Sequence, residues 1–311
     1  MESAAELEHY TPKVVPPEVL AYGSTLAQLG VGKAGKLGAL VLRLEEDKNS
    51  GKTSVKEQYS RVPLYAQRAL YLEEALPNMA YMYIISPSGG ILQGDRYRMD
   101  ITLRNRAFAH ITTQGATRIY RMERNYATQV INIHVGEGCY FEYIPDQVIP
   151  YRDSRFYQEA NLNVHDNATL LYSEIITPGR VASGEHFDYD ICYMKAIAKD
   201  HTGHIKFTDV AMLEPKKRDM KVFGVLSSHD VVANMYIITK NKPQEINIQV
   251  NEALKAIPKV YAGATILPSN CGVGIRMLGN TASDLRNVIY EVVRIVRRII
   301  LDAPFSGIRK G

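Results

Sequence analysis

Short runs in which apolar and polar residues alternate, rich in Val, Ile, Tyr, Phe and Thr, follow one another along most of the chain. Clusters of Gly, Asp, Asn, Ser and Lys separate these runs, for example at residues 47–51, 136–138 and 165–167. Alternation with a period of two is typical of strands, and Gly, Asn and Asp clusters favour turns. The pattern therefore predicts a chain built mainly from short β-strands.

Three segments repeat one arrangement: an aliphatic–polar–aliphatic run, a three-residue polar turn and then a small residue. They are residues 101–107, 133–139 and 162–168, which start 32 and 29 residues apart. Repeats of this length indicate stacked supersecondary units that cover each other's apolar faces, here a β-solenoid or β-helix-like stack. Residues 194–207 contain a weaker fourth copy. Three degenerate matches also leave open a sandwich of unrelated hairpins.

Two segments of the C-terminal third change to helical periodicity. Apolar residues spaced by three and four predict a helix near 281–302, with Thr281 or Ser283 as the N-cap. A shorter helix is predicted near 243–257. The predicted fold class is all-β dominated: a β-helix or solenoid-like stack of short strands with two α-helices in the C-terminal region.

The first 34 residues lack this alternation. They are interrupted by Pro12, Pro16 and Pro17, so residues 1–34 are predicted to be a loosely structured lead-in and residues 35–311 a single β-helical domain. Because the N-terminus has neither a basic nor an apolar signal region, a cytoplasmic location is expected. Arginines interrupt the longest apolar stretch, residues 292–301, so no membrane span is expected.

Composition narrows the partners and cofactors. The 311 residues include 37 basic and 33 acidic ones, a formal charge of +4 that is too small to indicate nucleic-acid binding. Cys139, Cys192 and Cys271 are odd in number and widely separated, which excludes a disulfide framework or zinc ribbon. His201 and His204 fall in a predicted turn, so neither a tight metal site nor a permanent cofactor is predicted.

Acidic residues inside apolar strands are the most unusual feature. Glu174 lies in a run that is apolar on both faces, and Glu142 lies in a similar run shortly before Asp146. A buried carboxylate needs a partner, a shifted pKa or a polar cavity. Two interpretations stay open: the acids line an internal polar passage, or they form buried salt bridges with an arginine such as Arg155 or Arg180.

A glycine-rich stretch at residues 86–95 invites comparison with a phosphate-binding loop. Asp95, however, stands where such a loop needs lysine, so its glycines are interpreted as turn formers. The sequence also lacks the G-x-S-x-G and H-E-x-x-H motifs, and spacing alone assembles no catalytic constellation.

Ordered sequence blocks resemble one known family. They are PLYAQR (63–68), SGGILQGD (88–95), TTQGATRIYR (112–121), EYIPD (142–146), SEIITPGR (173–180), GE (184–185) and GVGIRMLG (272–279). Together they are similar to the urease accessory protein UreD, called UreH in some species. Residues 1–34 match nothing in the family, and the C-terminal end lacks the PR-x-W ending common there.

The resemblance implies a non-enzymatic scaffold with a β-helical body that binds UreF, the GTPase UreG through UreF, and apo-urease. It also implies transient passage of Ni²⁺ toward the urease active site and a homodimeric arrangement within the complex. Positions that match the suspected passage acids are Asp95, Glu142, Asp146 and Glu174. Positions that match partner or structural motifs are Gly89, Gly90, Gly94, Tyr120, Arg121 and Arg180. On this basis Glu142→Ala or Glu174→Ala is expected to lower urease activation without affecting UreF binding.

Two other functions follow from the same residues. A β-helical hydrolase would use a carboxylate pair drawn from Asp95, Glu142 and Asp146 as general acid and base. A nucleotide-binding protein would use the glycine-rich stretch and be stabilised by ATP or GTP. Arginines of the last predicted helix form a basic face that suits an acidic partner, although a solvated face is the ordinary interpretation. These arginines are Arg286, Arg294, Arg297 and Arg298.

Overall fold

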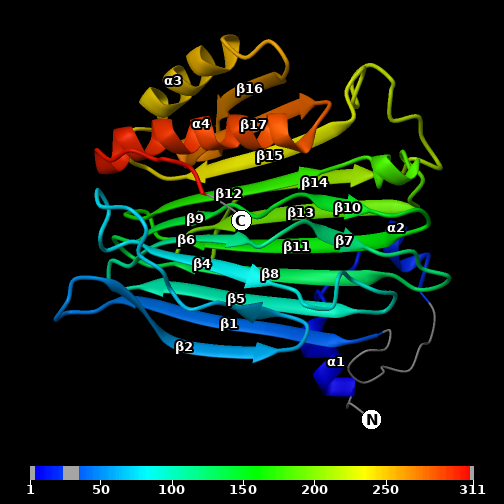
Figure 1. Cartoon of the computed structure of the whole chain (residues 1–311), viewed down its shortest axis with the longest axis horizontal. Coiled ribbons are helices and arrows are strands. Elements are labelled where there is room, and N and C mark those ends of the chain that lie inside the picture. The colour runs from blue at the N-terminus through cyan, green and yellow to red at the C-terminus, as the bar shows by residue number, and fades with distance from the viewer. Residues whose placement is uncertain (1–3, 24–34, 309–311) are drawn as a thin grey trace.

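The computed structural model describes residues 4–23 and 35–308, and within them two β-sheets stack face to face (Figure 1). Sheet A has seven strands, of which β1, β5, β8, β11 and β13 are parallel, while β2 and β14 are antiparallel edges. Its spatial order is β14 (Ile205–Leu213), β13 (Ile191–Lys199), β11 (Arg155–Val164), β8 (Ala127–Val135), β5 (Arg96–Arg104), β1 (Leu37–Glu46) and β2 (Thr53–Arg61).

Sheet B contains ten strands with a parallel centre formed by β4, β6, β9 and β12. Its main path is β16 (Tyr261–Ile266), β17 (Gly272–Gly279), β15 (Val231–Ile238), β12 (Thr169–Ile176), β9 (Tyr140–Tyr143), β6 (Phe108–Thr113), β4 (Ala80–Ile85) and β3 (Tyr65–Ala66). Strand β10 (Val148–Pro150) pairs with β12 and with β7 (Thr117–Ile119).

The chain passes alternately from sheet A to sheet B and makes a β-solenoid-like stack of about four turns. The three predicted repeats are consecutive turns, because Ile133 pairs with both Ile101 and Leu162 in the parallel register of β5, β8 and β11. The solenoid interpretation is therefore confirmed. The fourth copy, residues 194–207, is out of register with the other three, because Leu162, which begins the third copy, pairs with Ala198 rather than with Met194, which begins the fourth. The turn of the fourth copy connects β13 to β14 in an antiparallel hairpin, and this hairpin ends the parallel stack.

Both predicted C-terminal helices are present, as α3 (Pro243–Lys255) and α4 (Ala282–Leu301). Thr281 is the N-cap of α4, and its side-chain oxygen accepts a hydrogen bond from the backbone N–H of Asp284 at 3.1 Å. The apolar stripe of α4 packs on the outer face of sheet B. In the lead-in, α1 (Ala4–Tyr10) and α2 (Pro17–Leu20) are short helices, whereas residues 24–34 lie outside the described part.

Two large apolar cores result from this layering. One lies between the sheets, and the other lies between sheet B and the helices. Strand β12 contributes to both, with Leu170 and Tyr172 in the first and Leu171 and Ile175 in the second, as its doubly apolar sequence predicted. Within residues 4–23 and 35–308, no helix is long and apolar enough to cross a bilayer.

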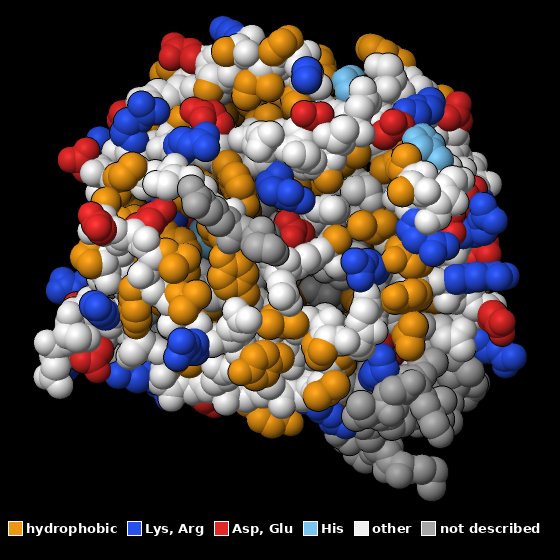
Figure 2. All heavy atoms as spheres, in the orientation of Figure 1, with side chains coloured by type: hydrophobic (Ala, Val, Ile, Leu, Met, Phe, Trp, Pro, Cys, Tyr) orange, Lys and Arg blue, Asp and Glu red, His pale blue; other side chains and the backbone are white. Residues whose placement is uncertain are grey.

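On the face drawn in Figure 2, and leaving aside the residues drawn in grey, acidic side chains (red) and basic side chains (blue) are interspersed. This distribution agrees with the small formal charge of +4. Such a face does not provide the extended basic stripe that nucleic-acid binding uses.

Candidate functional site: a polar cavity between the sheets

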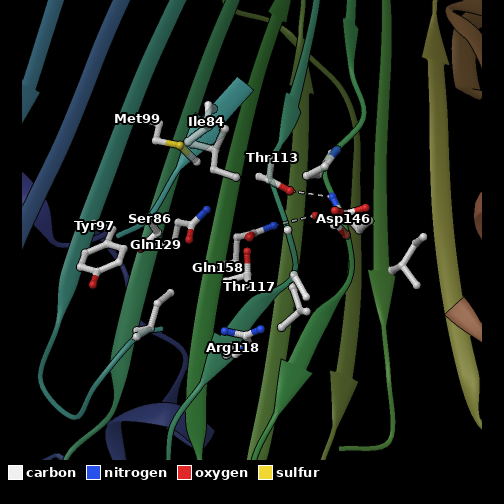
Figure 3. A pocket seen from close by; sticks show the side chains of 18 of the residues that line it. Ile84, Ser86, Tyr97, Met99, Thr113, Thr117, Arg118, Gln129, Asp146 and Gln158 are labelled. Atoms are coloured by element: carbon white, nitrogen blue, oxygen red, sulfur yellow. Dashed lines mark hydrogen bonds between the residues drawn. The ribbon is translucent and has the colours of Figure 1, made fainter. Parts of the chain in front are cut away.

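A cavity with a volume of about 250 Å³ lies between the two sheets (Figure 3). Its mouth is formed by residues 86–90, 113–118 and 145–148, among which Gln114 and Arg118 are exposed. Polar side chains line its interior, and Gln158 points into it from sheet A. The other polar or sulfur-bearing side chains of the wall include Tyr97, Met99, Gln129, Tyr143, Tyr172, Ser173, Glu174 and Met194.

Glu174 lies on the inner face of β12 and is only 4% exposed. Its Oε1 accepts hydrogen bonds from the Tyr172 hydroxyl at 2.7 Å and from Nε2 of Gln158 at 2.9 Å. Asn234 sits opposite on β15, and its Oδ1 accepts no hydrogen bond from the described residues. No described Lys, Arg or His side chain forms an ion pair with Glu174, so its carboxyl group and the unused Oδ1 of Asn234 lie on neighbouring strands without a cationic partner from the described residues.

Burial raises the pKa of Glu174 to about 7, although hydrogen bonds from Tyr172 and Gln158 act in the opposite direction. The side chain therefore exchanges its proton close to neutral pH. A cation that enters the cavity competes with this proton for the carboxylate.

Asp146 is the second predicted acid that the structure brings to the cavity. It lies at the mouth, where its backbone N–H donates to Oγ1 of Thr113 at 2.9 Å, and its carboxylate pairs with Nε of Arg286 from α4 at 3.2 Å. The passage interpretation thus keeps Asp146 at an entrance and Glu174 inside.

Glu142 does not face the cavity, which corrects the prediction that it lines the same passage as Glu174. The β9–β12 register places Glu142 beside Leu171, on the helix side of sheet B. There Nε and Nη2 of Arg297 lie 2.7 Å from its two carboxylate oxygens, and Nδ1 of His110 lies 2.6 Å from one of them. Burial favours the protonated form, but the Arg297 charge and hydrogen bonds outweigh it and lower the pKa of Glu142 to about 2.

The salt-bridge interpretation therefore describes Glu142, but with a different partner from the predicted Arg155 or Arg180. Arg155 pairs with Asp190, and Arg180 pairs with Glu185. Arg297, expected on an exposed basic face of the last helix, is 0% exposed, because its guanidinium serves this ion pair.

Asp95 closes the glycine-rich turn and does not line the cavity. Its carboxylate accepts hydrogen bonds from the backbone N–H groups of Lys36 at 2.8 Å and Leu92 at 2.9 Å, and from the Tyr97 hydroxyl at 2.9 Å. Gly94 next to it has φ +74°, a conformation that glycine adopts without strain. The turn-former interpretation fits this geometry, and the phosphate loop does not.

The remaining motif residues form a packed rim beside the cavity mouth. Gly89 and Gly90 line the cavity and pack against Tyr120, whose ring makes an edge contact with Tyr151 at 4.9 Å. The Arg180 guanidinium lies 4.2 Å from the centre of the Tyr151 ring. Arg121 is largely exposed and pairs with Asp153 at 3.2 Å.

Gly90→Ala is expected to destabilise this rim by about 1–3 kcal/mol, because overpacking forces neighbouring groups to move. A Cβ at Gly90 would lie 2.4 Å from Cε2 of Tyr120 and 2.6 Å from the carbonyl oxygen of Arg118. Urea unfolding measures the effect. Gly115→Ala is the matched control, since Gly115 lines the same mouth but has nothing within 4 Å of the added carbon. Equal unfolding midpoints for both variants would contradict the close packing.

Sequence reasoning missed Gln129, Gln158 and Asn234, although a signal for two of them is present. In β11, Gln158 has the same period-two phase as the inward residues Phe156 and Leu162, and Gln129 is its register partner on β8. An inward glutamine on two adjacent strands indicates a polar strip inside the stack. Asn234 could be placed only once the β12–β15 pairing was known.

The donor groups of the cavity wall are of the kind that contact a hydrated cation weakly. The wall offers one carboxylate at the inner end, amide oxygens, hydroxyls and the thioethers of Met99 and Met194. In the described residues, no group of three or more His, Cys, Asp or Glu side chains is placed to hold a metal ion, and the three cysteines are buried and free. Such ligands replace part of a hydration shell without forming a closed site.

The fold and cavity define a β-solenoid protein with a polar space between its sheets and two helices on one outer face. The chain belongs to the UreD family: the model described as UreD urease accessory protein matches residues 36–310. Proteins named urease accessory protein UreD are similar along nearly the whole chain. The one from Cenarchaeum symbiosum (strain A) is 40% identical over 286 residues, covering 92% of this chain and 100% of that protein.

Two bacterial relatives with the same name show a comparable likeness. The protein from Photorhabdus laumondii subsp. laumondii is 37% identical over 288 residues, 92% of this chain and 89% of its own length. The protein from Yersinia enterocolitica serotype O:8 / biotype 1B is 34% identical over 310 residues, with 97% and 94% covered. The family predicted from the sequence motifs is thus confirmed.

Proposed function

We propose that this chain is a non-catalytic scaffold of urease maturation that binds apo-urease and UreF, recruits UreG through UreF, and conducts Ni²⁺ through the cavity. The proposal rests mainly on Glu174, whose buried carboxylate has no cationic partner among the described residues and lines a cavity that opens to the surface. The chain that carries it is a member of the UreD family. The complex operates in the cytoplasm and contains two copies of this chain.

The ligands suit transport better than storage. Ni²⁺ binds carboxylates and imidazoles well, and a dense cluster of them would trap the ion. A single carboxylate with neutral oxygens binds more weakly, and weak successive sites allow an ion to enter and leave. Asp146 at the mouth and Glu174 inside supply two such sites.

The geometry gives less support to the two alternatives. The hydrolase alternative needs two of Asp95, Glu142 and Asp146 in one groove, but Glu142 faces α4 and Asp95 is held within a turn. Of these three acids Asp146 alone lines the cavity, and its carboxylate is paired with Arg286. A nucleotide site needs free backbone N–H groups in the glycine-rich stretch, whereas the Leu92 N–H is used by Asp95.

Co-expression with urease subunits, UreF and UreG tests the scaffold role. We expect this chain to co-elute with UreF and UreG in size exclusion, and urease to gain nickel and activity only when the chain is present. Nickel content measured on purified urease separates delivery from later steps. Full nickel loading without this chain, or failure to co-elute with UreF, would contradict the proposal.

A further inference from the structure

A passage needs two ends, and the exposed lining residues of the cavity, within the described part of the chain, gather at one of them. Its mouth lies at residues 86–90, 113–118 and 145–148, and Glu174 lies at the inner end. Beyond Glu174, side chains pack together between the sheets at the edge formed by β14, β15 and β17. Four side chains at this edge are here called the end cluster: Phe207, Asp209, Tyr236 and Arg276.

The end cluster connects the interior to the surface in short steps. The Tyr236 ring, which is buried, stacks on Tyr172 at 6.3 Å, and its hydroxyl donates to Oδ2 of Asp209 at 2.6 Å. The same oxygen accepts a hydrogen bond from Nη2 of Arg276 at 2.5 Å. The Asp209 side chain is 28% exposed and that of Arg276 is 52% exposed, so the outer end of this chain of contacts reaches solvent.

The register fixes how close the cluster lies to Glu174. Glu174 is opposite Asn234, and Asn234 is opposite Arg276, so Glu174 and Arg276 occupy one row of sheet B two strands apart. Adjacent strands are about 4.8 Å apart, which separates their backbones by about 10 Å. Burial is the main cause of the raised pKa of Glu174, and the negative charge of Asp209 adds to it, as expected for acids at this range.

The ion pair between Arg276 and Asp209 is partly exposed to solvent, so it can break at little cost. A half-exposed pair contributes little to stability, because water competes for both charges. The Arg297–Glu142 pair differs, since both its partners are 0% exposed. A cation beside Asp209 would replace Arg276 without breaking any buried structure.

We infer that Asp209, Tyr236 and Arg276 form the second opening of the passage, at which a divalent cation displaces Arg276 from Asp209. This inference rests on the proposed function. Asp209 then acts as the outer site that follows Glu174, and Arg276 acts as the positive charge that closes the exit when no cation is passing.

Two variants, one that removes the positive charge of Arg276 and one that removes the negative charge of Asp209, test the inference. Arg276→Gln leaves an unpaired carboxylate and is expected to speed nickel transfer to urease by about twofold or more, whereas Asp209→Asn is expected to slow it by about threefold or more. Both changes break the same ion pair, so a purely structural role predicts effects of the same sign. The readout is the initial rate of radioactive Ni²⁺ incorporation into urease by the complete accessory complex.

Matched variants keep the outcome decisive. Arg43→Gln and Asp166→Asn break half-exposed ion pairs elsewhere and should leave the rate unchanged, and Arg276→Lys should behave as the wild type. Unchanged rates, or changes of one sign, for Arg276→Gln and Asp209→Asn overturn the second opening. If Asp209→Asn fails to fold, an unchanged or lower rate for Arg276→Gln overturns it alone. Slow transfer by Glu174→Gln in the same assay shows that the proposed function itself still stands.

Discussion

Glu174→Gln is expected to make the protein more stable at pH 8 and to reduce nickel-dependent urease activation by about tenfold or more. Glutamine keeps the size of the side chain and can still accept a hydrogen bond from Tyr172. It removes the carboxylate charge that the buried part of the cavity wall offers to a cation. Stability and function therefore change in opposite directions.

The stability part follows from the proton equilibrium of Glu174. Burial raises its pKa in the folded protein from the ordinary 4.5 to about 7. The folded state thus holds the proton more tightly than the unfolded state, and stability falls as the pH rises from about 4.5 through about 7. Above that range the ionised carboxylate costs about 3 kcal/mol, a cost that glutamine avoids.

Urea unfolding at pH 5 and pH 8, combined with the activation assay, measures both effects. The advantage of the glutamine variant should be small at pH 5 and largest at pH 8. Glu137→Gln is the control, because Glu137 is an exposed turn residue that lies outside the cavity. A Glu174→Gln protein that activates urease normally would remove Glu174 from the passage.

Local sequence patterns determined most of the fold. Strand phase placed Leu170, Tyr172 and Glu174 on one face of β12, and the repeats gave the parallel register that pairs Ile133 with Ile101. These features depend only on neighbouring residues or on a repeat of fixed length. For the same reason the helix boundaries of α4 were predicted within a residue.

The candidate site was predicted only in part, because it depends on contacts between distant segments. Which face Glu142 takes relative to Glu174 is set by the β9–β12 register, and a shift of one residue reverses the face. Its partner Arg297 is 155 residues away and becomes a neighbour only when α4 packs on sheet B. The predicted arginines, Arg155 and Arg180, were nearer in sequence but lie elsewhere.

Arg297→Met is expected to destabilise the protein by about 3–5 kcal/mol, because it leaves the buried charge of Glu142 without its partner. Glu142 owes its low pKa of about 2 to Arg297, which overcomes the opposing effect of burial. The ion pair therefore stabilises the fold above about pH 4.5, and this contribution is lost as the pH falls toward 2. Urea unfolding at pH 7 and pH 3.5 measures the loss.

Arg294→Met on the same helix is the matched control, since Arg294 is exposed and pairs with Glu291 one turn away. It should change the free energy of unfolding by about 0.5 kcal/mol or less. The double variant Glu142→Gln with Arg297→Met removes both charges and should recover much of the stability that the single variant loses.

The same physics changes what is expected of Glu142→Ala in urease activation. Because Arg297 would be left buried opposite Glu73 alone, the fold that presents the partner surfaces weakens, and UreF binding and activation should fall together. Glu174→Gln should instead reduce activation while the complex still forms. A Glu142→Ala protein with wild-type stability and intact UreF binding, but without nickel delivery, would return Glu142 to the passage.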